Sequence, residues 1–306
     1  MNNHQLITND FASYEAVMEQ VKGVFNLMDI ADTTKEEYQQ RIKLFLIFIR
    51  KDGFNRNSFL EFKRYLKERI DYSVSTKNKY LATSRIFLKE LNRQGLLPTD
   101  ITQNIKSFSQ LHKHKRDGFN DEEIKKLMDY LQRKRNNPEN TRMKSIFSFL
   151  ILQGLRQCEI TRLKINDIDL IHKTCFVLGK GQGDKELINL HPETVKNIRN
   201  YLDINKISDG YLFPSKSNKN LNNQLTVRGL RQIVKKVLNK IHLEKNIHGF
   251  RHHFTTKLIE SYKGDLLEVA HYTRHKSLEM LQVYNDNIKL KKDLPRYYKV
   301  FDQIKF

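Results

Sequence analysis

The side chains best suited to chemistry lie in the second half of the chain and comprise arginines, histidines, a lysine and a tyrosine. They are Arg156, Lys180, His248, Arg251, His275 and Tyr284. Cleavage of a phosphodiester needs neutralised non-bridging oxygens, a nucleophile in line with the leaving oxygen, and a proton for that oxygen. An arginine fork matches two phosphate oxygens and stays protonated, and a tyrosine hydroxyl can act as the nucleophile. The set is therefore suited to breaking a phosphodiester through a tyrosine.

The arginines and the first histidine stand at helix starts. Arg156 follows Gly154-Leu155, and Glu159 lies three residues on, on the same helical face, where it could hold the guanidinium in place. His248 and Arg251 also lie three residues apart and project from one face. Taken alone, the first pair equally fits an ordinary salt bridge at a helix start.

Lys180 lies at the expected tip of a β-hairpin. Its segment reads Leu178-Gly-Lys-Gly-Gln-Gly183, and the glycines allow a tight turn that carries a lysine toward a ligand. Lys185 lies in the same hairpin and is the alternative candidate. A solvent-exposed hairpin lysine fits the segment equally well. A P-loop is excluded because the pattern GxxxxGK[ST] is absent.

The residues around the histidines do not favour a metal site. His248 and His252 have the His-x-x-x-His spacing, but residue 249 is Gly where a zinc protease has Glu. No carboxylate stands at a spacing that would complete such a site. We therefore expect neither a metal nor any other cofactor.

Tyr284 is one of 13 tyrosines, and its setting favours a role. Ser277 resembles a helix N-cap, Leu278 and Leu281 are expected to be buried, and the tyrosine falls near the end of a short helix at about 277–286. A buried structural tyrosine is the alternative.

The charge of the chain points to a polyanion as partner. Lys and Arg number 55 against 35 acidic residues, and the net charge is +20. This excess favours nucleic acid, since no basic amphipathic helix stands alone at either end to suggest a membrane surface. Cys158 and Cys175 form no CxxC pair, which fits a reducing compartment. With neither a signal peptide nor an apolar run long enough to span a bilayer, we expect a cytoplasmic, nucleoid-associated protein.

The first part of the chain reads as helices. Thr34 and Glu37 form a capping box that opens a helix with apolar residues at intervals of three and four, and Gly53 ends it. A second helix carries Phe59 and Phe62, and a third runs over about 75–95. We assign residues 1–110 to a helical domain and 111–119 to a linker.

The second domain, 120–306, begins with a capping box formed by Asn120 and Glu123. Short apolar runs at 167–171, 175–178 and 186–190 predict a small antiparallel meander. Helices are expected at about 141–152, 156–163, 226–241, 248–262, 265–273 and 277–286, and another opens at His191-Pro192. Pro295 is expected to interrupt regular structure in the tail that follows Tyr284. The apolar residues beyond it predict a docked tail, on its own domain or on a neighbouring copy.

Taken together, these residues resemble the tyrosine recombinase family, of phage-integrase or Xer-like type. The family pattern is an arginine in a G-L-R-x-x-E context, a hairpin lysine, H-x-x-R, a later histidine, and a tyrosine nine residues after that. The resemblance covers about residues 120–290 as the catalytic domain. It implies a mainly α fold with a small antiparallel β-meander, in which the first domain is a helical core-binding (SAM-like) DNA-binding domain.

The resemblance also implies site-specific DNA strand exchange. Tyr284 would form a 3′-phosphotyrosyl bond, Arg156 and Arg251 would bind the phosphate, and Lys180 would protonate the leaving oxygen. His248 and His275 would hydrogen-bond the phosphate, and His248 is the better candidate for accepting the tyrosine proton. Neither ATP nor metal is required. The partners would be double-stranded DNA with inverted-repeat core sites, further copies of the chain in a tetramer, and accessory proteins.

One departure from the family pattern lies beside a catalytic position. Many members have Leu-Gly-His where this chain has Thr273-Arg274-His275, so a cation replaces glycine and could contact phosphate or alter the approach of His275. Two rival functions stay open: a type IB topoisomerase, and a non-catalytic architectural DNA-binding protein. The biological role could be integration, excision, dimer resolution or resolution of transposon cointegrates.

Overall fold

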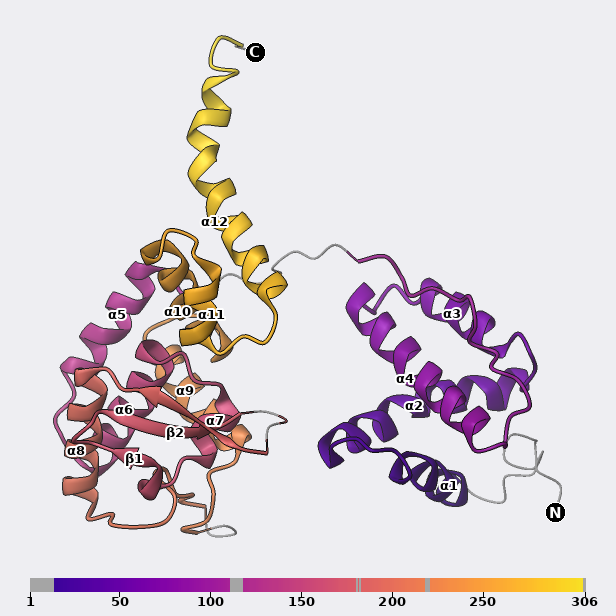
Figure 1. Ribbon diagram of the computed structural model, residues 1–306, viewed down its shortest axis with the longest axis horizontal. Coiled ribbons are helices and arrows are strands. Elements are labelled where there is room, and N and C mark those ends of the chain that lie inside the picture. The colour runs from indigo at the N-terminus through magenta and orange to yellow at the C-terminus, as the bar shows by residue number, and fades with distance from the viewer. Residues whose placement is uncertain (1–13, 111–117, 180, 182, 218–220, 305–306) are drawn as a thin grey trace. The chain divides into compact units, whose positions relative to one another are not determined.

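The computed structural model describes residues 14–110, 118–179, 181, 183–217 and 221–304 (Figure 1). The chain divides into two compact units, Met1–Leu111 and His112–Phe306, and each has a hydrophobic core of its own. The expected linker at 111–119 falls outside the described residues as far as position 117. The assignment of residues 1–110 to a core-binding domain and 120–306 to a catalytic domain stays a prediction.

The first unit is built from helices around an aromatic core. They are α1 (Tyr14–Asn26), α2 (Asp32–Asp52), α3 (Ser58–Glu68) and α4 (Val74–Arg93). The apolar positions at intervals of three and four face inward, among them the fully buried Phe45, Phe59 and Phe62. The Thr34–Glu37 capping box is wrong, because the Thr34 N–H already donates to the Ala31 carbonyl at 2.8 Å and the residue lies inside the first turn of α2. The helix α1 was not expected from the sequence.

The second unit is organised around a helix that is buried on nearly every side. This helix, α6 (Pro138–Leu152), packs against α8 (Pro192–Asn205), with α5 (Asp121–Gln132), the short α7 (Gln157–Arg162) and α9 (Val227–Lys240) around them. At the start of α5, the Asn120 side chain accepts from the Glu123 N–H while the Glu123 carboxylate accepts from the Asn120 N–H, so this capping box is confirmed.

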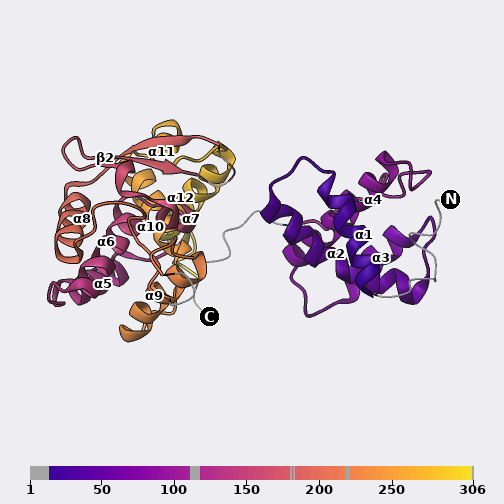
Figure 2. The ribbon, with the colours of Figure 1, turned by 90° about the horizontal axis from the view of Figure 1, so that it is seen from below.

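A three-stranded antiparallel sheet lies along one face of these helices in the described part of the chain (Figure 2). After a 3₁₀ turn at Ile165–Asp167, the strands are β1 (Ile168–Asp169), β2 (Thr174–Leu178) and β3 (Lys185–Asn189), in sequence order. Along β2, Cys175 and Val177 face the main core, and Phe176 between them is exposed. The expected fold class, mainly α with a small antiparallel meander, is confirmed.

The second unit ends in α10 (His248–Ser261), α11 (Leu266–Thr273) and α12 (Leu278–Lys299). The expected break at Pro295 is wrong: α12 continues through it and projects away from α10 and α11 (Figure 1). Docking of the tail on its own unit is also wrong, since Tyr298, Val300 and Phe301 are at least half exposed. An interior proline removes one backbone donor, and α12 accommodates that loss. Across the described residues, no helix is both long enough and apolar enough to cross a membrane.

Candidate active site

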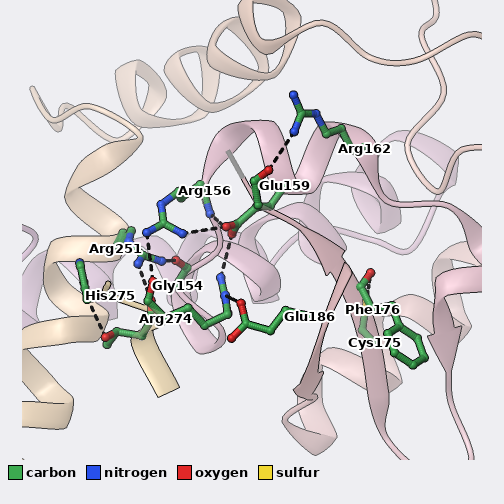
Figure 3. Close-up of polar contacts among 12 residues, drawn as sticks. Gly154, Arg156, Glu159, Arg162, Cys175, Phe176, Glu186, Arg251, Arg274 and His275 are labelled. Carbon is green, nitrogen blue, oxygen red and sulfur yellow. Dashed lines mark hydrogen bonds and ion pairs between the residues drawn. The ribbon is translucent and has the colours of Figure 1, made fainter. Parts of the chain in front are cut away.

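Arg251 joins segments that are far apart in the sequence. The side chain is buried on α10, where its Nη1 donates to the Gly154 carbonyl at 2.8 Å and its Nη2 donates to the Thr273 carbonyl. These carbonyls lie two residues before Arg156 and two residues before His275. One planar guanidinium therefore holds three of the sequence-predicted site segments together (Figure 3).

Gly154 makes this arrangement possible through its backbone. Its φ is +56°, and a Cβ built there would lie 2.3 Å from the Phe254 ring. A side chain at this position would therefore be strained by its backbone angles and would collide with the Phe254 ring. Glycine allows the turn between α6 and α7 to present its carbonyl to Arg251.

The contact expected between Arg156 and Glu159 is present. Arg156 Nη1 donates to Glu159 Oε1 at 2.9 Å, and the Arg156 backbone N–H donates to Oε2 at 2.7 Å. The Arg156 side chain keeps 32% of its surface exposed, so part of the guanidinium stays available for a ligand. Burial alone would raise the pKa of the Glu159 carboxyl, but the charge of Arg274 and the hydrogen bonds from Arg156 hold the pKa below its ordinary value.

Arg274 points into the protein, toward carboxylates. Its Nη2 lies 2.8 Å from Glu159 Oε2 and its Nε lies 3.8 Å from Glu186 Oε2 on β3, and only 5% of the side chain is exposed. Its backbone carbonyl accepts from Arg156 Nη2 at 3.3 Å (Figure 3). The sequence singled out Arg274 as unusual without locating its partners. Nothing in the spacing of Glu186 indicated a part in this site.

His275 is a neutral imidazole with a defined tautomer. The Thr273 hydroxyl donates to the Val269 carbonyl at 2.7 Å, so its oxygen must accept from His275 Nδ1, which lies 2.7 Å away. Burial, followed by the positive charges of Arg251, Arg156 and Arg274, lowers the pKa of His275 to about 3. The proton therefore sits on Nδ1, which leaves Nε2 as an acceptor.

The centre of the site carries unbalanced positive charge. Burial, together with the charges of Arg156 and Arg274, lowers the pKa of Arg251 to about 9. Arg251 itself bonds to neutral carbonyls, while Arg156 and Arg274 both bond to Glu159. An anion placed beside Arg156 and Arg251 would relieve this repulsion, which is the electrostatic condition for binding a phosphate.

Tyr284 lies close to this centre on α12. The side chain is 8% exposed, and burial raises the pKa of its phenol to about 12, an effect that the charge of Arg251 opposes. Its hydroxyl is hydrogen-bonded to Nδ1 of His252, a residue whose spacing from His248 had suggested only a zinc site that the neighbouring Gly249 excludes. The rings of His252 and His248 stand edge to face with centroids 4.5 Å apart. The pattern H-x-x-R-H places these histidines one turn apart on α10, which could have indicated that His252 shares a face with His248 but not that it contacts Tyr284 on α12.

Of the two lysine candidates, the structure describes only Lys185. Lys180 lies outside the described residues. Lys185, the alternative, forms an ion pair with the buried carboxylate of Asp167, so its ammonium is already engaged at the edge of the sheet. As for metals, the described residues contain no group of three or more His, Cys, Asp or Glu side chains placed to hold an ion.

Sequence comparison finds relatives over most of the chain. The model of the phage integrase family matches residues 118–290. A tyrosine recombinase XerC of Halalkalibacterium halodurans is 28% identical over 225 residues, which are 70% of this chain and 72% of the relative. A tyrosine recombinase XerC of Oceanobacillus iheyensis is 26% identical over 273 residues, which are 82% and 84% of the two chains.

Solved structures share the fold. The XerH site-specific recombinase bound to its palindromic difH substrate superposes with a TM-score of 0.72 at 18% identity, over 96% of this chain and 92% of that one. A lambda integrase (75–356) dimer bound to a COC′ core site gives a TM-score of 0.63 at 13% identity, over 89% and 94%. At these identities the likeness concerns the fold.

Proposed function

The chain belongs to the phage integrase family of tyrosine recombinases, and from this we propose that it is a site-specific recombinase that cleaves and rejoins DNA strands through Tyr284. The observation that carries the assignment of the site is the position of Arg251. Its hydrogen bonds to the Gly154 and Thr273 carbonyls bring Arg156 and His275 to one place, beside the helix that carries Tyr284.

The arginines would bind the scissile phosphate. The partly exposed fork of Arg156 and the charge of Arg251 suit the non-bridging oxygens, which gain negative charge as phosphorus becomes five-coordinate. Because these groups are already held by Glu159 and by backbone carbonyls, little reorganisation is needed during the reaction. His275 would contact a phosphate oxygen once that negative charge favours its protonation. His248 is proposed as a further phosphate ligand.

The phenol oxygen of Tyr284 would attack phosphorus. Its proton leaves to an imidazole, the new bond joins the tyrosine to the 3′ phosphate, and the bond from phosphorus to the 5′ oxygen breaks. With a pKa of about 12 the phenol is neutral at pH 7, so a base is needed. The contact with Nδ1 supports His252, rather than the expected His248, as the first acceptor of that proton. Attack by the 5′ hydroxyl of a partner strand reverses the step, returns the proton to the tyrosine and completes the exchange.

The leaving 5′ oxygen takes up a proton as its bond to phosphorus breaks. We keep Lys180 as the proposed donor, supported by the ion pair that engages Lys185 with Asp167.

The substrate is double-stranded DNA, consistent with the net charge of +20. Inverted-repeat core sites, assembly of a tetramer on two duplexes, and accessory proteins are parts of the proposal. They are supported by the relatives whose structures hold a palindromic substrate, or a dimer on a core site. The relatives' names favour recombination over DNA relaxation or a purely architectural role.

A suicide substrate, a duplex nicked so that the cleaved strand is lost, tests the activity. We expect the wild-type chain to accumulate a covalent DNA adduct and Tyr284→Phe to form none while its affinity for the duplex is kept, because only the nucleophile is removed. Tyr297→Phe, at an exposed tyrosine of the same helix, is the matched control and should react normally. Adduct formed by the Tyr284→Phe protein would refute the assignment.

The same substrate tests the base. His252→Phe keeps a ring beside the tyrosine and removes the acceptor, so we expect cleavage at pH 7 to slow by about 100-fold and to recover partly at high pH. An unchanged rate and pH profile would return the role to His248.

A further inference from the structure

Arg274 stands where its backbone alone would favour glycine. It follows the last residue of α11 with φ 54° and ψ 46°, the left-handed conformation that L side chains rarely adopt, and its N–H donates to the Ala270 carbonyl. The long cationic side chain at this position must therefore be held by contacts that outweigh the backbone preference.

Those contacts connect the end of α11 to separate elements of the second unit. The guanidinium lies 2.8 Å from Glu159 on α7 and 3.8 Å from Glu186 on β3. The left-handed turn also directs the Arg274 carbonyl toward Arg156 Nη2. Glu159 thus accepts from Arg156 and from Arg274, while Arg156 donates both to Glu159 and to the Arg274 backbone (Figure 3).

We infer that Arg274 is a positioning residue: through Glu159 and its own carbonyl it fixes the orientation of the Arg156 guanidinium, and through Glu186 it ties strand β3 to the phosphate site. The inference rests on the proposed function, since it concerns how that phosphate site is held. With 5% of its side chain exposed and its fork turned toward carboxylates, Arg274 acts on Arg156 rather than on the DNA.

The contact network separates this role from direct DNA binding. A residue that touches the phosphate backbone contributes mainly to affinity and to its salt dependence. A residue that holds Arg156 contributes when the pentavalent phosphorus forms, so its loss slows cleavage at saturating DNA and leaves affinity nearly unchanged.

The test compares Arg274→Gly, Arg274→Lys and Glu186→Gln with the wild-type chain. Glycine suits the left-handed backbone, which offsets only part of the ion pairs lost, so we expect Arg274→Gly to melt several degrees below the wild-type chain and to be fully folded at the assay temperature. Cleavage of the suicide substrate at saturating DNA should fall about 30-fold, with the duplex dissociation constant within about threefold. Lysine supplies a point charge without a fork and should restore only part of the rate. Glu186→Gln should slow cleavage by a few-fold, and its effect should largely vanish when Arg274 is already glycine.

Lys276→Ala is the matched control, because it removes an exposed positive charge two residues away. It should change affinity more than rate. A cleavage rate of Arg274→Gly within twofold of wild type, or a loss explained entirely by weaker binding, would overturn the inference.

A second measurement does not require catalysis. In protein with isotope-labelled arginine, a fixed Arg156 guanidinium gives separate Nη resonances, assigned by their loss in Arg156→Lys. These should merge in Arg274→Gly as the group begins to rotate, and separate resonances persisting in that variant would also overturn the inference. If the wild-type chain forms no adduct, the proposed function fails. If adducts form normally and Arg274→Gly matches wild type in both measurements, the positioning role alone fails.

Discussion

The two halves of the proposed active site are held in different ways. The arginine half, formed by Arg156, Glu159, Arg251 and Arg274, is fixed by ion pairs and by bonds to backbone carbonyls beside the main core of the second unit. The tyrosine half, formed by Ile259, Val269, Leu281 and Tyr284, is a separate small apolar cluster on α10, α11 and α12. Beyond that cluster, α12 carries exposed apolar side chains.

The two halves therefore suit different parts of the proposed reaction. The arginine half is held by ion pairs and carbonyl contacts within the protein, and its unbalanced positive charge favours an anion, as the proposed phosphate site requires. The tyrosine half rests on few buried side chains, so we expect Tyr284, the proposed nucleophile, to move at a lower free-energy cost than the arginines. A strand-exchange enzyme needs both properties, because the same phosphate-binding groups must serve attack by the tyrosine and then by an incoming strand.

The largest effect is expected from Arg251→Lys in the arginine half. A lysine ammonium is a single nitrogen and cannot replace both Nη atoms that donate to the Gly154 and Thr273 carbonyls. Cleavage should therefore fall by about 100- to 1000-fold, and the protein should lose about 3 kcal/mol of stability. Suicide-substrate rates and urea unfolding measure the two quantities. Arg296→Lys, at an exposed position of α12, should be neutral. A rate within tenfold of wild type would mean that the arginine half is not preformed.

The next effect concerns the tyrosine half. Leu281→Ala removes a fully buried side chain from the small cluster and should cost about 2–4 kcal/mol. The loss should appear in hydrogen exchange of α11 and α12 before it reaches the helices of the main core. Phe301→Ala, at a side chain that is 50% exposed, should change stability by less than about 0.5 kcal/mol. Equal loss of protection throughout the second unit would contradict the separation into two halves.

The smallest effect is a dependence of stability on pH through His275. Its folded pKa of about 3 lies below the ordinary histidine pKa of 6.5, so as the pH falls through 6.5 the unfolded chain binds a proton that the folded protein does not bind. Between pH 6.5 and 5.5 the wild-type protein should lose about 1 kcal/mol more than His275→Asn. Parallel stability curves over that interval would show that the imidazole is protonated in the folded protein.

Much of the fold follows from local patterns. Most helices with three- and four-residue apolar spacing, the meander, and the start of α5 after Asn120 lie where the sequence indicates. The short helix expected at about 277–286 is wrong in its length, since α12 continues to Lys299 and Tyr284 lies near its start rather than its end. Other wrong predictions concern single residues whose type suggests a helix end but which the helical turns on either side keep within a helix. Thr34 has the residue type of a cap yet lies inside α2, and Pro295 has the residue type of a breaker yet lies inside α12.

For the site, the residue types and their order were predictable, and their contacts were predictable only within one helical turn. The pairing of Arg156 with Glu159 follows from their spacing. The contact of Tyr284 with His252, and those of Arg274 with Glu159 and Glu186, join residues far apart in the sequence and depend on how helices and sheet pack.

By itself, the sequence determined the chemistry that the chain can perform, because arginine, histidine and tyrosine carry their charge and reactivity wherever they are placed. It also determined the elements that hold them, since caps and apolar spacing act over a few residues. Only the tertiary structure decided that Arg274 turns inward to carboxylates, that His252 contacts Tyr284, and that the tail stands exposed. These outcomes depend on burial and on the meeting of distant segments, which no spacing along the chain encodes.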